Sequence, residues 1–593
     1  MTAQAMALIS PSIKAGGTAL TAAQYGALTH MDIDLGLNLV GRSTLRFVQS
    51  AHDASLSSKF GLGTEVVLGT IESGSDKDLF KGLVTGVSLD YDGLRGMTML
   101  TVTVDDASYK LGENTQNTAF LNSSYSDVIT KMVSGTGLTS SIDATTATHP
   151  YLLQTGSNLN YLNWIVARCG MVWWVDFGKL NVKKISAAPG SAAAKVTLGE
   201  DLMRLSTRAS GLHPGKVTVT GWDEAQQAAV ANVASDTASA EADLVAKYPG
   251  RAAASGAGLK VSGASPLTAD EAKLVSETIL AESTAAAVTT RGTCYVNSSI
   301  RPFTKVEVAN AGPSSGKFLV TRVQHVFDGR DGFLTHFTAG PLRPEGLVDL
   351  LSGAPDTAGS TIDGLLVGVV TNIDDSEGKL GRVKVKFPTI SGDIESEWAR
   401  VVTLGGGPKR GVVFQPEVKD EVLVGFEQGD TRRPVVLGGL FSDKNGLPTS
   451  DNVESGAVNY RRINSRVGHL IELADGTSDD KKHILLKTSN GHLLRVGEDT
   501  IEMKTANKPI KITNGDATIT LTDSGDVTIQ GKNVTIKATQ GAVKIEAAAG
   551  DVAIKGVNVK AESTANLNLK AGALGSVEAT GPLTVKGATV AIN

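Results

Sequence analysis

The sequence ends in a run of apolar pairs that reads Val527-Thr-Ile529, Val534-Thr-Ile536, Val543-Lys-Ile545, Val552-Ala-Ile554, Leu567-Asn-Leu569, Leu583-Thr-Val585 and Val590-Ala-Ile592. Each pair places two apolar side chains on one face of a strand, with a polar or small residue between them. Successive pairs recur about every eight residues, and Gly, Asn or Asp commonly separates them. A unit this short cannot close a core alone, so it has to stack on copies of itself.

The composition of this region indicates how the pairs are buried. Aromatic residues make up 5% of the chain, yet none occurs from Leu494 to Asn593. A sheet packed on a domain core normally uses aromatic side chains, whereas a narrow axial core of Val, Ile, Leu and Ala has no room for rings. We therefore predict a thin prism in which three identical chains wind around one axis. A β-solenoid formed by a single chain and a disordered Gly/Ala-rich tail are the alternatives.

Upstream, residues 364–441 read as a compact all-β unit. Two strand patterns, Leu365–Val370 and Gly381–Phe387, flank a polar loop, and two more follow at Glu421–Phe426 and Pro434–Gly438. Short strands of this spacing suit a small five-stranded Greek-key barrel of the oligonucleotide/oligosaccharide-binding (OB) type. That fold alone implies no nucleic-acid ligand.

The first 345 residues mix strand patterns with a few helical ones. Helices are expected at 125–134 and 161–169, followed by an apolar strand at Met171–Val175 in which Trp173 and Trp174 anchor the core. An Ala-rich insert, about 223–287, reads as partly helical and partly flexible. The expected division of the chain is 1–345, a linker at 346–361, the barrel at 362–445, a neck at 446–495 and the needle at 496–593.

Composition and charge exclude several classes of protein. The formal net charge is −5, with 56 basic and 61 acidic residues, so no strong field attracts nucleic acid or an anionic membrane. No stretch reaches the roughly 18 apolar residues of a membrane span, and Met1 to Ile9 does not resemble a signal peptide. Cys169 and Cys294 are too few for a disulfide framework and read as buried small hydrophobic residues.

Few residue patterns suggest chemistry. Asp374, Asp375 and Glu377 lie in an apparent hairpin loop, where carboxylates are commonly solvated. The segment 405–411 is glycine-rich but lacks the Lys-Ser/Thr ending and the helix of a phosphate loop. On a threefold axis, three histidines could gather a metal, although turn or strand-surface roles are favoured: His469, His483 and His492. We expect no catalytic residue, no metal site, no cofactor and no enzymatic activity.

The barrel resembles a known family at several motifs. These are Gly381-Arg-Val-Lys-Val-Lys-Phe-Pro388, Trp398-Ala-Arg400, Pro416-Glu-Val-Lys-Asp-Glu-Val-Leu-Val-Gly-Phe426, Gly429-Asp430, Arg433-Pro434 and Leu437-Gly-Gly-Leu440. They are similar to the VgrG and phage tail hub/spike proteins of contractile injection systems. Further similarity lies in the neck at Gly468-His469, Asp475-Gly476 and Gly491-His492, and in the hub at 61–68, 80–82 and 316–325.

The resemblance implies a fold class and a set of partners. The fold is expected to be mainly β and multidomain, with tail-hub β-barrel domains, an OB-fold barrel and a C-terminal intertwined triple-stranded β-helix. The implied assembly is a homotrimer whose hub domains each contribute two tube-like barrels and cap a hexameric inner tube protein. A PAAR-type tip protein on the distal end and baseplate proteins are the other implied partners, with no nucleic acid and no stable membrane insertion. The particle would be type VI, phage-like or extracellular.

The sequence thus predicts a structural spike that is made in the bacterial cytoplasm and driven through a target envelope. The last residues, Val590, Ile592 and Asn593, would form an apolar three-chain platform that binds the tip protein. Two other functions stay open. One is a fibre-like adhesin or carbohydrate-binding protein that uses the barrel, and the other is a spike with a concealed wall-hydrolase activity.

Overall fold

The computed structural model describes residues 10–50, 54–72, 74–113, 115–210, 214–224, 226–235, 258–262, 266, 268–342, 361–478 and 481–592. The chain forms two compact units, Met1–Gly446 and Leu447–Asn593. Strands account for 45% and helices for 12% of the structure, which confirms the mainly β, multidomain prediction. The expected linker lies outside the described residues apart from Thr361, and so does much of the Ala-rich insert.

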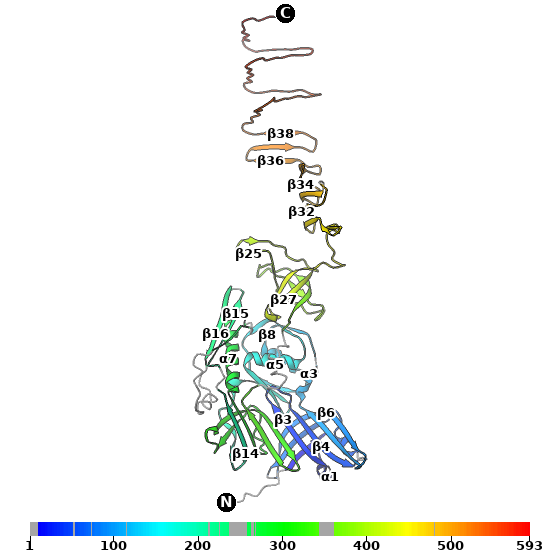
Figure 1. Ribbon diagram of the computed structural model, residues 1–593, viewed down its shortest axis with the longest axis vertical. Helices are drawn as coiled ribbons and strands as arrows, with labels where there is room; N and C mark the ends of the chain where they lie inside the picture. Colours follow the sequence, from blue (N-terminus) through cyan, green and yellow to red (C-terminus); the bar gives the residue numbers. More distant parts are fainter. Residues whose placement is uncertain are drawn as a thin grey trace. The chain divides into compact units, whose positions relative to one another are not determined.

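The part of the chain before the expected linker, residues 10–342 of the structure, is called the hub. It is built on one large sheet of 13 strands with the order β14-β18-β21-β20-β3-β4-β7-β6-β5-β1-β2 (Figure 1). In addition, β19 pairs with β20, and β13 pairs with β19. Its first half contains β1 (Ser10–Ala15), β2 (Thr18–Ala19), β3 (Leu28–Gly36), β4 (Arg42–Ser50), β5 (Glu65–Glu72), β6 (Ser75–Asp92) and β7 (Met97–Asp105). Its second half contains β13 (Ala192–Thr197), β14 (Leu202–Ala209), β18 (Val288–Tyr295), β19 (Lys305–Ala309), β20 (Gly316–Asp328) and β21 (Gly332–Ala339).

Alternation of apolar and polar residues explains why these segments form strands with one buried face. In β4, for example, Leu45 and Phe47 are fully buried while the residues between them are not. The buried face of both halves forms one core, which includes Ile33, Val102 and Val323. The antiparallel pairing of β3 with β20 joins the halves, so the hub sheet is continuous across them.

A second layer of the hub contains the helices expected from the sequence. Its longer helices are α4 (Tyr125–Val133) and α5 (Asn158–Cys169), which confirm both predictions, although α5 begins earlier because Ser157 caps it. The layer also contains β8 (Thr118–Ser124), β9 (Thr139–Ile142), β10 (Thr148–Gln154), β11 (Met171–Asp176) and β12 (Lys179–Lys184). Trp173 is fully buried in its core, whereas Trp174 is only half-buried and stacks on Phe303. Both cysteines are free and buried, as predicted.

The remaining helices of the hub are short. They are α1 (Ala22–Gly26), α2 (Ser55–Lys59), α3 (Lys110–Glu113), and the 3-10 turns η1 (Ala107–Tyr109), η2 (Ile185–Ala187) and η3 (Gly312–Ser314). The described part of the Ala-rich insert is ordered. It contains β16 (Ala228–Ser235), β17 (Gly258–Val261) and α7 (Ala269–Ala286), which pack with the preceding strand β15 (Lys216–Asp223). Val217 and Val219 of β15 and Val275 of α7 are buried between sheet and helix.

The barrel has a five-stranded sheet with the order β23-β22-β27-β28-β24. Its strands are β22 (Leu365–Asn372), β23 (Lys384–Lys386), β24 (Arg400–Val401), β27 (Glu421–Phe426) and β28 (Pro434–Gly439), with the 3-10 turn η4 at Glu427–Gly429. A small core that includes Val385, Phe387 and Val424 fills it. A separate hairpin of β25 (Gly406–Gly407) and β26 (Arg410–Gly411) extends from the barrel.

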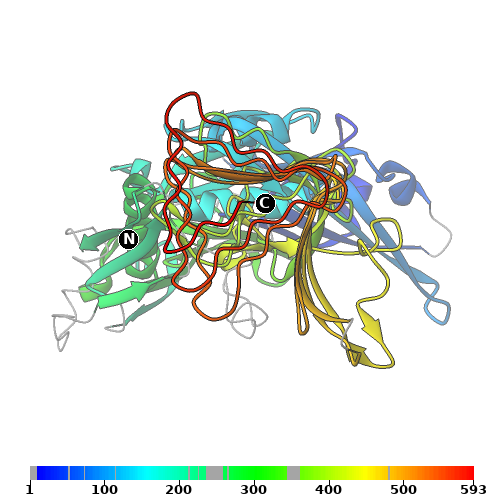
Figure 2. The same ribbon diagram turned by 90° about the horizontal axis from the view of Figure 1, so that it is seen from above.

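The C-terminal unit consists of successive small sheets. After the hairpin of β29 (Val453–Glu454) and β30 (Ala457–Val458), five strands form an antiparallel sheet: β31 (Tyr460–Asn464), β32 (Leu470–Asp475), β33 (Lys482–Lys487), β34 (Leu493–Gly497) and β35 (Ile501–Lys504). A three-stranded sheet of β36 (Ile510–Asn514), β37 (Ala517–Leu521) and β38 (Val527–Gln530) follows. Residues 531–592 are described but form no strand within the chain. Seen from above, this last segment turns back on itself in successive loops (Figure 2).

Candidate functional site

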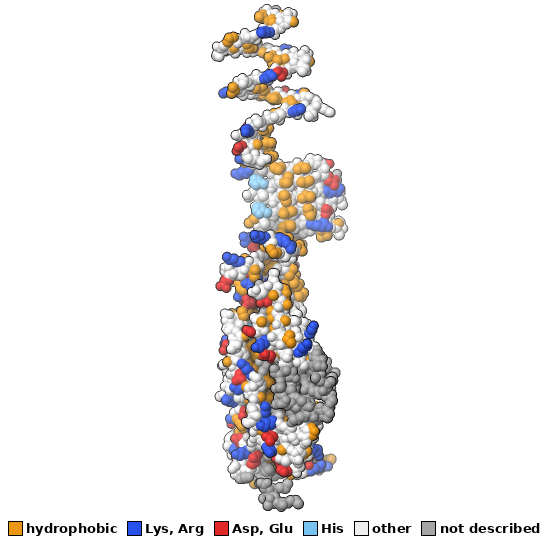
Figure 3. All heavy atoms as spheres, turned by 90° about the vertical axis from the view of Figure 1, so that its left-hand side faces the viewer, with side chains coloured by type: hydrophobic (Ala, Val, Ile, Leu, Met, Phe, Trp, Pro, Cys, Tyr) orange, Lys and Arg blue, Asp and Glu red, His pale blue; other side chains and the backbone are white. Residues whose placement is uncertain are grey.

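The most unusual surface of the protein is an apolar face on the C-terminal unit. Cross-strand pairing in the five-stranded sheet aligns two rows of apolar side chains, Ile463–Ile471–Leu486–Leu494–Met503 and Leu473–Ile484–Val496–Ile501. The rows appear as columns of hydrophobic side chains on the sheet in Figure 3. All of these residues are exposed except Leu494, which is half-buried. An exposed apolar surface of this regularity is typical of an interface.

The same two rows continue in the next sheet. Strand pairing aligns Ile510 with Leu521 and Val527, and Ile512 with Ile519 and Ile529. Beyond Gln530 the apolar pairs of the sequence continue but strand pairing within the chain does not. Their side chains are strongly exposed: 69% for Ile536, 70% for Ile545 and 75% for Ile554. The apolar pairs therefore continue in a segment where the single chain provides neither a core to bury them nor a strand to pair with.

The opposite face of the five-stranded sheet is polar. Arg462 of β31 forms ion pairs with Glu472 of β32 and with Asp451, and His483 lies 3.0 Å from Glu472. The hydrogen bond from Arg462 lowers the pKa of the Asp451 carboxyl to about 2. The sheet is therefore amphipathic, with one face suited to water and the other to burial.

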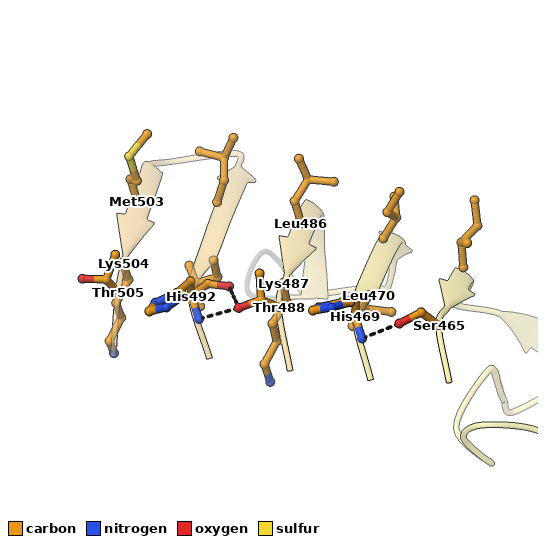
Figure 4. A pocket seen from close by; sticks show the side chains of 14 residues that line it. Ser465, His469, Leu470, Leu486, Lys487, Thr488, His492, Met503, Lys504 and Thr505 are labelled. Atoms are coloured by element: carbon orange, nitrogen blue, oxygen red, sulfur yellow. Dashed lines mark hydrogen bonds between the residues drawn. The ribbon is translucent and has the colours of Figure 1, made fainter. Parts of the chain in front are cut away.

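A groove of about 490 Å³ lies on this sheet, at the end where the hairpins turn. Figure 4 shows Leu486 and Met503 projecting to one side of the sheet and Lys487 and Lys504 to the other. Two histidines hold the turns together. The Nδ1 atom of His469 accepts a hydrogen bond from the backbone N–H of Ser489 at 3.2 Å, and His492 accepts one from Ala506 at the same distance.

The hydrogen bonds of these histidines argue against a metal site there. Because Nδ1 accepts a hydrogen bond, the neutral ring of His469 or His492 carries its proton on Nε2 and has no lone pair left for a cation there. His483 instead lies beside Glu472. Among the residues that the structure describes, no group of three His, Cys, Asp or Glu side chains could hold a metal ion.

The other candidate site residues predicted from the sequence either have structural roles or do not lie close together. Asp375 is buried, and its carboxylate accepts hydrogen bonds from Arg382, which hold its pKa well below the usual range. Asp374 and Glu377 are exposed, so the three carboxylates do not converge. The segment 405–411 forms the β25–β26 hairpin and leads into no helix. Val590 and Ile592 are exposed, Ile592 at 91%, and Asn593 lies outside the described residues.

A buried ion cluster joins the hub to the barrel and was not foreseen from the sequence. Glu271 of α7 accepts hydrogen bonds from Arg168 of α5 at 2.8 Å and from Arg432 of the barrel at 3.0 Å. Arg432 also pairs with Asp430 at 2.7 Å. Burial opposes the charge on Asp430, but the guanidinium groups of Arg432 and Arg168 outweigh it and lower the pKa of that carboxyl. Two cations and two anions thus balance at the junction, and the insert supplies one of them.

Buried His149 lies close to this cluster, with its ring centroid 4.2 Å from that of Tyr125. Burial, reinforced by the nearby Arg432 charge, lowers the pKa of His149 to about 4. The imidazole is therefore neutral at pH 7, and it has to take up a proton in the interior when the solution is acidified.

In the described part of the chain, no helix has the length and apolar character needed to cross a lipid bilayer.

Comparison with known proteins places the chain in a family. The model of the type VI secretion system/phage-baseplate injector OB domain matches residues 366–441, and the model of the Alg8 N-terminal domain matches residues 5–328, more than half of the chain. The chain belongs to the VgrG and phage tail spike family, with an Alg8 N-terminal domain in its hub. The family and OB-domain predictions are confirmed.

Two curated relatives share parts of the chain. The type VI secretion spike protein VgrG5 of Pseudomonas aeruginosa is 34% identical over 128 residues, which cover 20% of this chain and 16% of the relative. The spike protein VgrG3 of Vibrio cholerae is 32% identical over 94 residues, 15% of this chain and 9% of the relative. The chain therefore spans less than a fifth of the length of either relative.

The solved structures that the chain matches include a tail protein, a type VI secretion component and a VgrG complex. The 43 kDa tail protein of prophage MuSo2 from Shewanella oneidensis has a TM-score of 0.44 at 15% identity, over 56% of this chain and 98% of that chain. The c3393 type VI secretion component of E. coli gives 0.44 at 14%, over 70% and 96%. The half-lidded Francisella PdpA-VgrG complex gives 0.45 at 9%, over 88% and 87%.

The ion cluster gives a first prediction. Changing Glu271 to Gln leaves two buried guanidinium groups with one carboxylate, so the free energy of unfolding of the hub should fall by about 3–5 kcal/mol. The matched control is Glu65→Gln, because Glu65 forms an exposed ion pair with Lys81 and should contribute less than about 1 kcal/mol. Denaturant unfolding followed by tryptophan fluorescence measures both variants. Equal stability of the two variants would contradict a stabilising role for the cluster.

The pKa of His149 gives a second prediction. Its folded-state pKa lies below the value of about 6.5 in an unfolded chain, so between pH 6.5 and about 4 the unfolded state binds more protons. Stability should therefore fall as the pH is lowered through this range, with His149 contributing on the order of 2–3 kcal/mol. His149→Gln should flatten the decline in unfolding free energy measured against pH. Parallel curves for the variant and the unchanged protein would argue against it.

Proposed function

We propose that the protein is a structural spike of a contractile injection system, without enzymatic activity, and that it acts as a homotrimer. The family is one of spike-like structural proteins of type VI secretion systems and phage baseplates. In the proposed role, the hub caps a hexameric inner tube, baseplate proteins surround it, and the C-terminal unit is driven through the target envelope. The spike would act as part of a secreted injection particle.

The exposed apolar rows of the C-terminal unit are the observation that carries this proposal. Burying one Val, Leu or Ile side chain contributes roughly 1.5–3 kcal/mol, and the rows and pairs from Ile463 to Ile592 contain many such residues. A single chain forgoes nearly all of this free energy. The backbone of residues 531–592 also lacks strand partners within the chain, and other copies of the same segment can supply them.

Three features favour a closed bundle of three chains over a stack of two sheets. The apolar face is only two residues wide along each strand, which suits a narrow axis. It contains no aromatic residue in its last hundred positions. Winding several chains around one axis also pairs every strand edge, which prevents open-ended aggregation. The number three follows the family resemblance.

The positions of the aromatic and acidic side chains of the barrel argue against the two other functions. A carbohydrate-binding barrel needs aromatic side chains for stacking, whereas Phe387 is buried in the barrel core and Trp398 packs beside Arg382 and Lys384. Only Phe414 and Phe441 of the aromatic residues in 366–441 are largely exposed. The carboxylates of the barrel loop do not converge as a hydrolase pair would require.

The distal end would bind the tip. Val590 and Ile592 continue the apolar pairs, and both side chains are exposed. Three copies of this last pair would form an apolar platform of threefold symmetry, to which Asn593 adds a polar edge. A PAAR-type tip protein is the partner we propose for it.

A substitution within one pair tests the needle. Ile545→Asp would place three carboxylates at the apolar axis, and the lifetime of the 531–592 segment under protease should shorten by more than about tenfold, because buried like charges repel and lack partners. Lys544→Asp introduces the same side chain on the alternate face and should leave the lifetime within about twofold. If the two variants were cleaved at the same rate, the proposed burial of Ile545 would be wrong.

A truncation tests the platform. Ending the chain at Thr589 removes Val590, Ile592 and Asn593 and should weaken the binding of a purified PAAR-type tip protein by at least about tenfold, as measured by biolayer interferometry. The control is Ala591→Ser, which alters the residue between the two apolar positions. Unchanged binding after truncation would place the tip elsewhere.

A further inference from the structure

The second layer of the hub contains a cavity that the proposed spike function does not use. This cavity, called here the hub pocket, has a volume of about 460 Å³. Volumes of roughly 300–1,000 Å³ are usual for sites that hold a small organic ligand or a short piece of chain. The hub pocket is therefore large enough for a few residues of an extended peptide.

Two helix ends and the segments beside them form the hub pocket. Helix α4 ends at Val133, and Gly135 then takes a left-handed backbone conformation, with φ of 86°, that turns the chain. Helix α5 begins at Asn158 and is capped by Ser157, whose hydroxyl accepts a hydrogen bond from the backbone N–H of Asn160 at 3.2 Å. In addition, α3 packs on α5 and α4 on β8. Figure 1 shows α3, α5 and β8 in this layer.

Two buried amide side chains line the hub pocket and are only partly hydrogen-bonded. Gln154 is 1% and Asn158 is 6% exposed. The Nε2 atom of Gln154 donates to Oδ1 of Asn158 at 2.7 Å and to the carbonyl oxygen of Gly156 at 3.3 Å. Within the described part of the chain, Oε1 of Gln154 and Nδ2 of Asn158 have no hydrogen-bond partner. The pocket thus keeps one acceptor and one donor unused.

A peptide group is complementary to this amide pair. It offers one N–H donor and one C=O acceptor, which match the unused Oε1 of Gln154 and the unused Nδ2 of Asn158. Buried amide groups without partners are unfavourable, so a ligand that satisfies both is favoured over one that satisfies neither. The pair therefore points to a ligand that contains a peptide-like amide.

Lys131 provides a positive charge at the pocket. Its Nζ atom lies 5.8 Å from the centre of the Phe120 ring, which also lines the pocket. Asp127 of the same helix is within electrostatic reach of Lys131, but its carboxylate accepts hydrogen bonds from Ser124 at the start of α4. Among the described residues, no carboxylate forms an ion pair with Lys131. The ammonium group is therefore available to an anionic ligand.

The other charges of the pocket favour a single carboxylate. Lys110 lines it as well, and its Nζ atom donates to the carbonyl oxygen of Thr136 at 3.2 Å, which leaves two further N–H groups. Glu113 is the acidic side chain in the lining. Two lysines and one glutamate leave a net charge of +1, and the N-terminal end of α5 adds a positive partial charge. This balance suits one carboxylate better than a polyphosphate.

We infer that the hub pocket binds the C-terminal end of a polypeptide whose last residue has an apolar side chain. The terminal carboxylate pairs with the two lysines, and the last peptide group bonds the amide pair. The terminal side chain packs on Phe120 and Met132, which are buried and apolar. Capture of a chain terminus is a known mode of peptide recognition. The inference depends on neither the homotrimer nor the spike role, and it adds a docking site for a second protein to the hub.

Peptide binding to the full-length protein tests the inference. The probe is N-acetyl-alanyl-alanyl-leucine with a free carboxylate, and the matched ligand is the same peptide with a C-terminal amide. Titration calorimetry should show the free carboxylate binding at least about tenfold tighter, because the amide loses the charge-assisted hydrogen bonds. Equal affinities, or no binding of either peptide, would overturn the inference.

Two smaller ligands separate the groups that the pocket recognises. Isocaproate has the carboxylate and the apolar group without a peptide group, and it should bind at least about tenfold more weakly than the peptide. N-acetyl-leucine has only the last peptide group and should bind at least about threefold more weakly. Isocaproate as tight as the peptide would refute the role of the amide pair. N-acetyl-leucine as tight as the peptide would make the ligand a free acylated amino acid and not a chain end.

Variants locate the site. Lys131 is exposed, so Lys131→Gln should preserve the fold and weaken binding of the carboxylate peptide by about tenfold. The matched control is Lys77→Gln, which changes an exposed lysine of β6 outside the pocket and should leave the affinity unchanged. Ser134 is exposed at the end of α4 and lines the pocket, so Ser134→Trp should block binding without lowering the denaturant midpoint. Unchanged binding by Ser134→Trp, or an equal loss in the Lys77→Gln control, would overturn the site.

Discussion

The burial of a two-row apolar stripe is the constraint on which this structure depends. The stripe begins at Ile463 in the five-stranded sheet and continues through Ile512 to Ile592, yet almost all of it is exposed in one chain. The exposure of apolar surface to water is unfavourable in proportion to its area, and no element among the described residues of the C-terminal unit covers these rows. Association with identical copies removes the penalty and completes the backbone pairing in the same step. Stiffness, which a piercing element requires, then follows from continuous strand pairing along the axis.

The hub is one continuous sheet of 13 strands, because the pairing of β3 with β20 joins its two halves. The buried cluster of Arg168, Glu271 and Arg432 connects this hub to the barrel. The Ala-rich insert, whose role could not be predicted from the sequence, therefore supplies a charge that holds the barrel on the hub.

Local patterns made much of the fold predictable from the sequence. Helical sequence patterns located α4 and α5, although the cap of α5 at Ser157 lay outside its predicted bounds, and strand alternation with turn residues located the barrel. The apolar pairs identified the C-terminal unit, but the needle was expected only from residue 496, whereas the apolar rows begin at Ile463. That earlier part was hidden because its strands are joined by longer, polar turns and its alignment exists only through pairing.

Other features depend on contacts between distant positions and leave little trace in a local pattern. Arg432 and Glu271 are 161 residues apart, and nothing in either segment marks them as partners. The sequence grouped Asp375 with two other acidic residues, but in the structure its carboxylate accepts a hydrogen bond from Arg382 and stabilises the loop.

The most direct test of the central claim is the mass of the full-length chain in solution, combined with amide hydrogen exchange of residues 531–592. The account predicts a particle of three times 61.5 kDa in which the amides of this segment are strongly protected. A particle of a single chain in which the same amides are protected would show that the apolar pairs bury themselves without partners, and would contradict the account.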